Sequence, residues 1–282
     1  MNQEELLVYC KNITKEYGSN YYRATSLFPR EVRDTVYVYY TWLRIPDEIV
    51  DSSTDVNNMA SDLQKWIFQW VSLTQGERQD GVGIHSLFWG ICQKYNIPLE
   101  YSYSFLRSME LDLHKKEYKT YDDLYEYMYG SACVVGLTLL HIFNLQKKEL
   151  IPYATLLGEA MQLANFLRDI QEDFELRQRV YIPLDDLHRF GVSVDDIARK
   201  NHSNNFRKLM QYEIKRCREK YKDAWVGIEK LPWRLKFPIR VATRNYEGVL
   251  QEIEKNDYNI WYQKHGLSKF KKIVIIIKSI FI

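Results

Sequence analysis

Glycine and proline are scarce in this sequence, with 12 and 7 copies among 282 residues. Their share, 19 of 282 or about 7%, is well below the average of roughly 12%, so turns are few and long helices are expected. The glycines form neither G-x-G-x-x-G nor G-x-x-x-x-G-K-[ST], which leaves a nucleotide-binding fold unsupported.

Cysteine and an excess of charge of one sign are lacking as well. The four cysteines lie far apart, form no C-x-x-C pair, and are Cys10, Cys92, Cys133 and Cys217. We therefore expect no disulfide framework and no zinc site, and a reducing cytoplasm as the location. The 39 basic and 37 acidic side chains leave a net charge of +2, which argues against a nucleic-acid partner.

Signals for a membrane span or for secretion are also missing. Residues 1–9 contain no apolar core of signal-peptide length. The C-terminal apolar run, 273–277, follows Lys271 and Lys272 and has five residues, where a span needs ~20. We expect the tail, residues 268–282, either to lie on an anionic membrane surface or to cover the core as a final helix or strand.

Apolar residues recur at helical spacing through most of the chain. Helices are expected over residues 35–51, 61–74, 102–116, 122–143, 151–175, 206–231 and 238–254. No linker and no sustained strand alternation divides them, so we predict a single all-α domain over residues 1–282. Aromatic side chains are abundant, with 22 Tyr, 12 Phe and 7 Trp, which is more than a core requires.

Aspartates four residues apart share a helix face and can bind one hard cation together. The pairs with this spacing are Asp47/Asp51, Asp51/Asp55 and Asp169/Asp173. Such a pair usually marks a solvated helix face. We assign Asp55, which lies beyond the end of its expected helix, to solvent.

The two other pairs belong to longer polar stripes with spacings of three and four residues. The first stripe is Tyr40, Arg44, Asp47 and Asp51, and the second is Gly158, Gln162, Asn165, Asp169 and Asp173. The rest of each helix is apolar, whereas an ordinary surface helix has a broad polar face. Both stripes are therefore expected to face a lined cavity.

Two carboxylate pairs that face each other would repel and raise their own pKa values unless cations lay between them. Oxygen ligands without histidine or cysteine favour Mg²⁺, or Mn²⁺, over zinc. Mg²⁺ usually takes one or two carboxylates and completes its shell with water and phosphate oxygens. The two stripes therefore predict a site that clamps a diphosphate.

Four segments of the chain resemble the squalene/phytoene synthase family, the head-to-head prenyl synthases. They are residues 21–33, 44–51, 127–136 and 158–173, the last with its trailing loop 179–183. Residues 44–51 and 158–173 resemble the two aspartate-rich motifs of the family, and the likeness runs from about residue 9 to residue 272. Residues 187–192 and 245–258 are more similar to bacterial-type phytoene synthases than to eukaryotic squalene synthases.

The resemblance implies an all-α prenyl-synthase bundle around a central cavity. It also implies that one allylic diphosphate ionises, a second attacks it, and the cyclopropylcarbinyl diphosphate formed rearranges to a hydrocarbon. We expect two geranylgeranyl diphosphates to give phytoene with loss of a proton. The alternatives are a squalene or dehydrosqualene synthase acting on farnesyl diphosphate, with NADPH for squalene alone, and a non-catalytic relative used for assembly or binding.

Within that reaction the resemblance and the chemistry of the side chains assign roles. Mg²⁺ is expected to bind Asp47, Asp51, Asp169 and Asp173, with Asn165 as a further oxygen ligand. The other groups expected to contact substrate are Tyr21, Arg44, Gln162, Arg179 and Tyr181. Tyr40, Tyr129 and Tyr181 are expected to hydrogen-bond the diphosphate or to take part in the proton loss.

Two features of these segments leave alternatives open. Pro46 lies inside the first stripe and either kinks its helix or marks its end. The loop after the second stripe is slightly long for the family, so Arg177 is an alternative to Arg179 at the phosphate. Arg168, beside Asp169, is either a ligand or the pairing partner of a buried acid.

The segment 129–136 carries small residues at helical spacing. Ala132, Cys133 and Gly136 follow Tyr129 on what we take to be one face. This face either allows close helix packing or makes room for prenyl chains, in which case Cys133 is a small wall residue and not a nucleophile.

Overall fold

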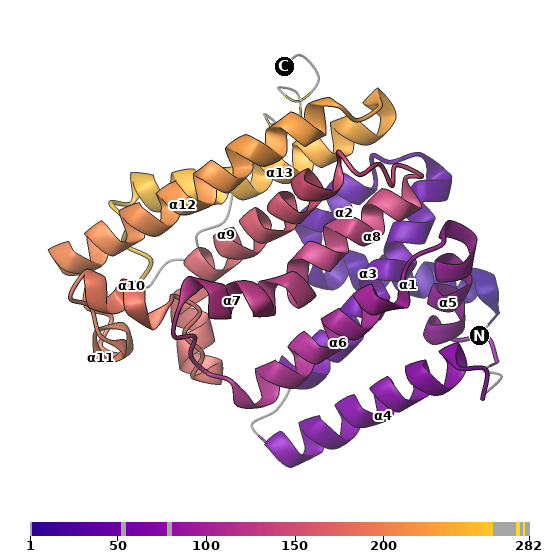
Figure 1. Cartoon of the computed structure of the whole chain (residues 1–282), viewed down its shortest axis with the longest axis horizontal. Helices are drawn as coiled ribbons and strands as arrows, with labels where there is room; N and C mark the ends of the chain where they lie inside the picture. The colour runs from indigo at the N-terminus through magenta and orange to yellow at the C-terminus, as the bar shows by residue number, and fades with distance from the viewer. Residues whose placement is uncertain (1, 52–54, 78–80, 262–274, 277–278, 280–282) are drawn as a thin grey trace.

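A computed structural model describes residues 2–51, 55–77, 81–261, 275–276 and 279. Within these ranges the regular structure is helical, and the β-type pairing is one isolated bridge between Glu117 and Val180. The predicted all-α class is confirmed (Figure 1). No helix in the described ranges is long and apolar enough to cross a membrane. The tail 268–282 lies outside them, apart from residues 275, 276 and 279.

The elements follow one another with short connections. In chain order they are α1 (Gln3–Tyr17), α2 (Ser19–Thr25), α3 (Arg30–Asp51), α4 (Val56–Thr74), α5 (Ile84–Tyr95), α6 (Leu99–His114), α7 (Tyr121–Met128), the π-helical turn η1 (Tyr129–Cys133), α8 (Val134–Ile142), α9 (Ile151–Arg177), α10 (Leu184–Arg189), α11 (Val194–Ala198), α12 (Asn204–Glu229) and α13 (Trp233–Lys255).

The two predicted stripes lie on α3 and α9. Pro46 stands inside α3, which continues to Asp51. Pro46 therefore does not end the helix. Proline removes one backbone hydrogen bond of the helix, but the turns on both sides remain helical. α9 has Pro152 in its first turn, where the missing N–H costs nothing, and ends at Gln178, whose φ is 54°. Each helix is longer than predicted, so each stripe is held on a rigid element.

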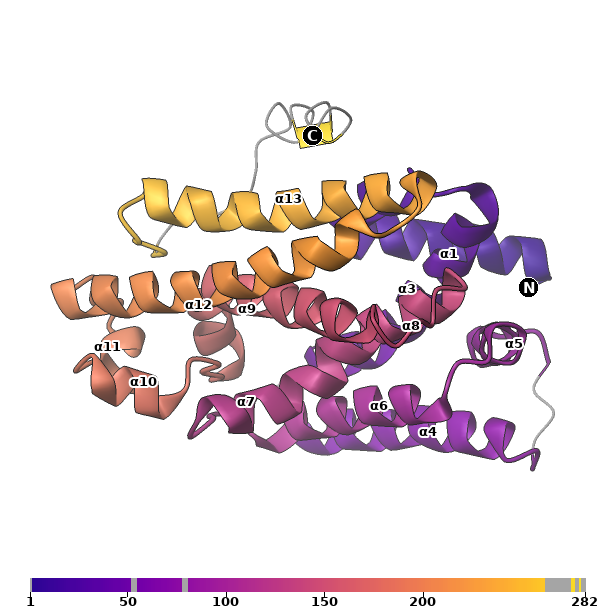
Figure 2. The same cartoon turned by 45° about the horizontal axis from the view of Figure 1, so that its top comes forward.

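α9 lies in the middle of the bundle. It packs against α12 and α13 on one side and against α8 and η1 on the other. Figure 2 shows α13 and α12 as an outer layer above α9, with α6 and α4 forming the opposite layer. One hydrophobic core gathers around α9 and α12 and a second around α3 and α6. Residues from both sets of helices enclose the cavity described below.

Glycines let α9 approach α8 and η1 closely. A Cβ on Gly136 would lie 2.4 Å from the carbonyl oxygen of Ala154, and one on Gly158 would lie 2.5 Å from that of Ala132. Close packing is thus one use of the small residues, and Ala132 and Gly136 also line the cavity. Cys133 is fully buried and is not among the lining residues, so of the two alternatives for this residue the structure favours close packing.

Gly158→Ala is expected to destabilise the protein by about 2 kcal/mol, because overpacking costs roughly 1–3 kcal/mol and exceeds the gain in helix propensity. The added methyl meets backbone atoms, which cannot rotate away. Gly90→Ala in α5 is the matched control, since nothing lies within 4 Å of its added Cβ. That variant should be more stable by up to about 1 kcal/mol. Urea unfolding of both variants measures the difference, and equal effects of the same sign would contradict the packing argument.

Candidate functional site

A cavity of about 650 Å³ lies between α3, α6, α8 and α9, within the range of roughly 300–1,000 Å³ that small-molecule sites occupy. Eleven of the twelve predicted site residues line it, namely Tyr21, Tyr40, Arg44, Asp47, Asp51, Gln162, Asn165, Asp169, Asp173, Arg179 and Tyr181. The two stripes therefore face one space. The roles assigned to these residues stay predictions.

Tyr129 is the predicted residue that the structure places elsewhere. Its side chain is 36% exposed and does not line the cavity. The cavity face of this segment is formed by Tyr127, Ser131, Ala132, Val135 and Gly136. Two residues after Tyr127 an α-helix has turned by about 200°, so Tyr129 points away. The four-residue spacing of Tyr127 from Ser131 was the signal in the sequence that could have identified Tyr127.

Each of the two helices that carry the stripes has an arginine that pairs with an aspartate of the same helix. Arg44 contacts the carboxylates of Asp47 and Glu48. Arg168 Nε donates to Asp169 Oδ1 over 2.7 Å. Arg168 thus pairs with Asp169 and also lines the cavity, so both alternatives for it stay open.

Two further arginines, from the end of α9 and the loop after it, join the two stripes. Arg177 Nε lies 2.9 Å from Asp51 Oδ1, and its Nη1 lies 3.4 Å from Asp173 Oδ1. Arg179 Nη1 donates to the same Asp51 oxygen over 2.9 Å. Arg179 is 5% exposed and Arg177 is 20% exposed. Both arginines therefore reach the acidic end of the cavity, and Arg179 is held there by burial.

The pKa values of two site aspartates, Asp173 and Asp47, lie above their usual range. Burial raises the pKa of Asp173 to about 8, and the nearby Asp169 adds to this while Arg177 opposes it. Burial likewise raises the pKa of Asp47 to about 7, against the effect of Arg44. The Asp47 side chain is 35% exposed and that of Asp173 is 16% exposed, so water moderates the shift more at Asp47. A cation at this end would favour the charged forms.

We expect the metal-free protein to become less stable as the pH rises from about 5 to about 8. The carboxyl of Asp173 has a pKa of about 8 when folded and 3.8 as its reference value. Between these values the native state holds a proton that the unfolded chain releases, so the free energy of unfolding falls with rising pH. Thermal unfolding in a chelating buffer measures the trend.

Asp173→Asn is the control for that trend, because asparagine does not titrate. Burial also raises the pKa of Glu213, on α12, to about 8, so part of the slope is expected to remain in the variant. A slope as steep as that of the unaltered protein would contradict the contribution of Asp173.

A second acidic group lies deeper in the cavity. Asp112 of α6 is 3% exposed and accepts hydrogen bonds from the hydroxyls of Tyr127 over 2.8 Å and Tyr181 over 3.0 Å. Burial raises the pKa of Asp112 to about 6, while Arg179 and the two hydroxyls oppose the shift. Phe166 stacks on the Tyr181 ring with centroids 4.0 Å apart. Asp112 has no aspartate four residues away, and its signal in the sequence was an acid between two leucines.

Much of the remaining wall is apolar, and Phe105, Met109 and Met161 are among its apolar residues. Apart from arginine nitrogens, three buried side-chain atoms of the lining make no hydrogen bond with a described residue, namely the Asn165 Oδ1, the Tyr21 hydroxyl and the Ser131 hydroxyl. Buried polar atoms normally have partners, so these three atoms are suited to bind a ligand. The cavity thus has one acidic, arginine-rich end and one long apolar end.

The donor set fits a hard divalent cation. All the acidic ligands offered are carboxylates, and Asn165 adds an unpaired amide oxygen. In the described part of the chain no three His, Cys, Asp or Glu side chains come together as one metal-binding group. Mg²⁺ takes one or two carboxylates and fills its shell with water and phosphate oxygens, so the carboxylate and amide oxygens of this cavity are of the kind that it binds.

Comparison with known proteins connects this geometry to a family. The family model described as squalene/phytoene synthase matches residues 14–272. A 15-cis-phytoene synthase of Synechocystis is 29% identical, with 97% of this chain and 84% of that protein covered. A chloroplastic phytoene synthase of an Oncidium hybrid is 32% identical, with 95% and 66% covered.

A likeness in three dimensions accompanies the likeness in sequence. The solved structure of a dehydrosqualene synthase in complex with ligand superposes with a TM-score of 0.89, covering 98% of this chain and 95% of that one. Its sequence identity is 24%, so this likeness establishes the helical fold and not the substrate.

Proposed function

This chain belongs to the squalene/phytoene synthase family and is a prenyltransferase that condenses prenyl diphosphates head to head, and we propose that it joins two geranylgeranyl diphosphates to give phytoene. The observation that carries the proposal is the single cavity with two facing aspartate stripes at one end and an apolar wall beyond them. The choice of the C20 substrate rests on the relatives. They match almost the whole of this chain, and they are named phytoene synthases.

We propose that Mg²⁺ is the cofactor, held by Asp47, Asp51, Asp169 and Asp173 with the Asn165 oxygen. When bound, the metal neutralises the negative charge of the diphosphate and makes it a better leaving group. Mn²⁺ has the same preference for oxygen ligands.

The arginines and the apolar wall of the cavity are expected to assist ionisation of the allylic diphosphate. We propose that Arg44 and Arg179, which line the cavity, hold diphosphate oxygens by charge-assisted hydrogen bonds. The apolar wall keeps water from the allylic cation, which would otherwise be captured as an alcohol. The aromatic side chains of Phe166, Tyr127 and Tyr181 line the cavity, and aromatic quadrupoles can stabilise a positive charge beside them.

Asp112 gives the final proton a destination. The hydroxyls of Tyr127 and Tyr181 both donate to its carboxylate. When the hydrocarbon cation loses a proton, the C–H electrons form the new double bond and a tyrosine oxygen accepts the proton. That tyrosine passes its own proton to Asp112, whose pKa of about 6 allows it to hold one. The positive charge of the hydrocarbon cation is thereby neutralised by the Asp112 carboxylate within the cavity.

Product analysis tests the proposal. The protein is incubated with geranylgeranyl or farnesyl diphosphate and Mg²⁺, with and without NADPH, and the hydrocarbon is identified. We expect phytoene from the C20 substrate, no need for NADPH, and no product in a chelating buffer. A C30 hydrocarbon alone would replace phytoene with squalene or dehydrosqualene, and the absence of any hydrocarbon would favour the assembly or binding role.

A further inference from the structure

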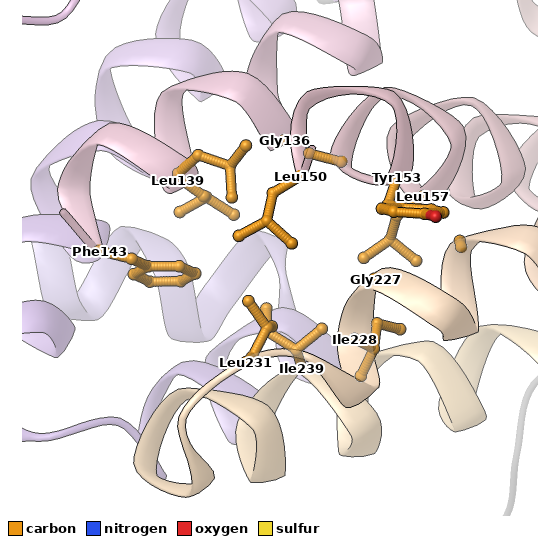
Figure 3. Close-up of a pocket in the computed structure, with 13 residues that line it drawn as sticks. Gly136, Leu139, Phe143, Leu150, Tyr153, Leu157, Gly227, Ile228, Leu231 and Ile239 are labelled. Atoms are coloured by element: carbon orange, nitrogen blue, oxygen red, sulfur yellow. The ribbon is translucent and has the colours of Figure 1, made fainter. Parts of the chain in front are cut away.

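A second, smaller chamber adjoins the cavity away from the aspartates. It has a volume of about 50 Å³ and is lined by apolar residues and Tyr153. Gly136, Leu139, Leu157 and Ile239 line both spaces, so the apolar wall continues from the reaction site into the chamber. Figure 3 shows the chamber between α8, α9, α12 and α13.

The chamber ends beneath two loops of the bundle. Phe143 and Leu150 lie at either end of the loop from α8 to α9, and Leu231 lies in the loop from α12 to α13 (Figure 3). Lys230, which follows α12, contacts the first turn of α9, since its Nζ lies 4.7 Å from the centroid of the Tyr153 ring. The apolar path from the active site therefore leads to one end of the molecule, which we call the loop end and define as residues 144–152 and 229–236.

The loop end combines exposed apolar and basic side chains. Ile151 is 40% exposed and Trp233 is 51% exposed. The loop end holds five basic and two acidic side chains, a net charge of +3, whereas the whole chain has +2, so the rest of the chain sums to −1. Lys147, Lys148 and Arg234 are exposed and form no ion pair with another described residue.

We propose that the loop end docks on an anionic membrane surface and delivers the apolar product to the bilayer. The delivery part rests on the proposed function, since a hydrocarbon product is insoluble in water. The docking part rests on charge: each Lys or Arg near an anionic bilayer contributes about 1 kcal/mol. Tryptophan is favoured at the headgroup level, and Trp233 projects from the same end. The apolar chamber lies between the cavity and these loops, on the side that would face the membrane.

Flotation with vesicles of phosphatidylcholine, with and without phosphatidylglycerol, tests the docking without any prenyl substrate. The full chain is expected to float with the anionic vesicles and much less with the neutral ones. The triple variant Lys147→Gln, Lys148→Gln, Lys230→Gln should lower the partition coefficient about a hundredfold, or about fivefold for each charge removed. Trp233→Ser should lower the partition coefficient at every salt concentration. Added salt should lower the contribution of the basic side chains to vesicle binding.

The control removes three exposed lysines elsewhere, with Lys65→Gln, Lys208→Gln and Lys215→Gln, and should bind like the unaltered protein. Equal loss in control and triple variant, equal flotation with neutral vesicles, or no effect of the triple variant would each overturn the proposal. Hydrocarbon formation in detergent micelles is measured on the same proteins and should be unchanged. If the unaltered protein forms no hydrocarbon in detergent micelles, the proposed function is refuted. The flotation result would still test membrane docking, because it needs no substrate.

Discussion

Asp173→Asn is expected to lower kcat/KM by about a thousandfold at saturating Mg²⁺, because removing one group that stabilises developing charge costs roughly 10²–10³. Asp173 lines the acidic end of the cavity and contacts Arg177, which also contacts Asp51 on the facing helix. Asparagine keeps the shape but offers one neutral oxygen to a divalent cation, which binds carboxylates in preference. Steady-state kinetics with the prenyl diphosphate substrate measures the effect.

Asp55→Asn is the matched control, since Asp55 also belongs to a D-x-x-x-D pair. Asp55 is exposed, lies outside the cavity, and caps α4 by accepting from the backbone N–H of Asn57 and Asn58. Asparagine caps helices about as well as aspartate, so stability and activity should be unchanged. A comparable loss of activity in both variants would show that the loss is not specific to the stripe.

Stability separates loss of metal from loss of fold in the Asp173 variant. Burial opposes the charge on Asp173, so the metal-free variant should be at least as stable as the unaltered protein near pH 8. Added Mg²⁺ should stabilise the unaltered protein by binding the native state and should have a smaller effect on the variant. Activity close to that of the unaltered protein would refute a metal-binding role for this carboxylate.

The local pattern of the sequence was sufficient to predict the two stripes. It was insufficient to predict Asp112 and its partners, which lie in the cavity between them. α3 and α9 are long helices buried on most sides, so their 3.6-residue period identifies the cavity-facing residues, Asp51 and Asp173 among them. Asp112 could not be assigned in this way, because its partners Tyr127 and Tyr181 are 15 and 69 residues away. Pairings at that separation depend on how helices pack and not on spacing along one of them.

The error at Tyr129 has the same origin in geometry. The π-helical turn η1 begins at Tyr129, and the turn adds a residue to the helix so that the facing side shifts along the chain. A reading with regular 3.6-residue spacing takes no account of such a turn. The family resemblance indicated that the segment carries a functional tyrosine, and the structure indicates Tyr127 as the tyrosine that faces the cavity.

Arg179→Gln and Arg177→Gln are expected to differ sharply. Arg179 is 5% exposed, and its Nη2 donates to the carbonyl oxygens of Val50 and Asp112, in addition to its pairing with Asp51. Removing its charge leaves the buried carboxylate of Asp112 without a cation. Breaking a buried pair in this way costs about 3–5 kcal/mol of stability. If Arg179 contacts the diphosphate, as proposed, kcat/KM should also fall by about a hundredfold or more.

Arg177 should behave as a competitor of the metal. Its guanidinium lies against both Asp51 and Asp173, where a bound cation would take its place. Arg177→Gln removes one positive charge from this end, so the Mg²⁺ concentration for half-maximal activity should fall by about tenfold, equivalent to one pKa unit of interaction. The fold should be unaffected, since the side chain is 20% exposed.

The two variants together decide which arginine serves the diphosphate. If Arg179 holds the leaving group, its variant should lose kcat/KM at every Mg²⁺ concentration, and extra metal should not restore it. If Arg177 does so, its variant should show that pattern and Arg179→Gln should lose stability while keeping most of its activity per folded molecule. Arg179 is fixed by two backbone carbonyls beside Asp51, so its guanidinium is positioned before substrate arrives. Such preorganisation favours stabilisation of charge as it develops, and we therefore expect the first pattern.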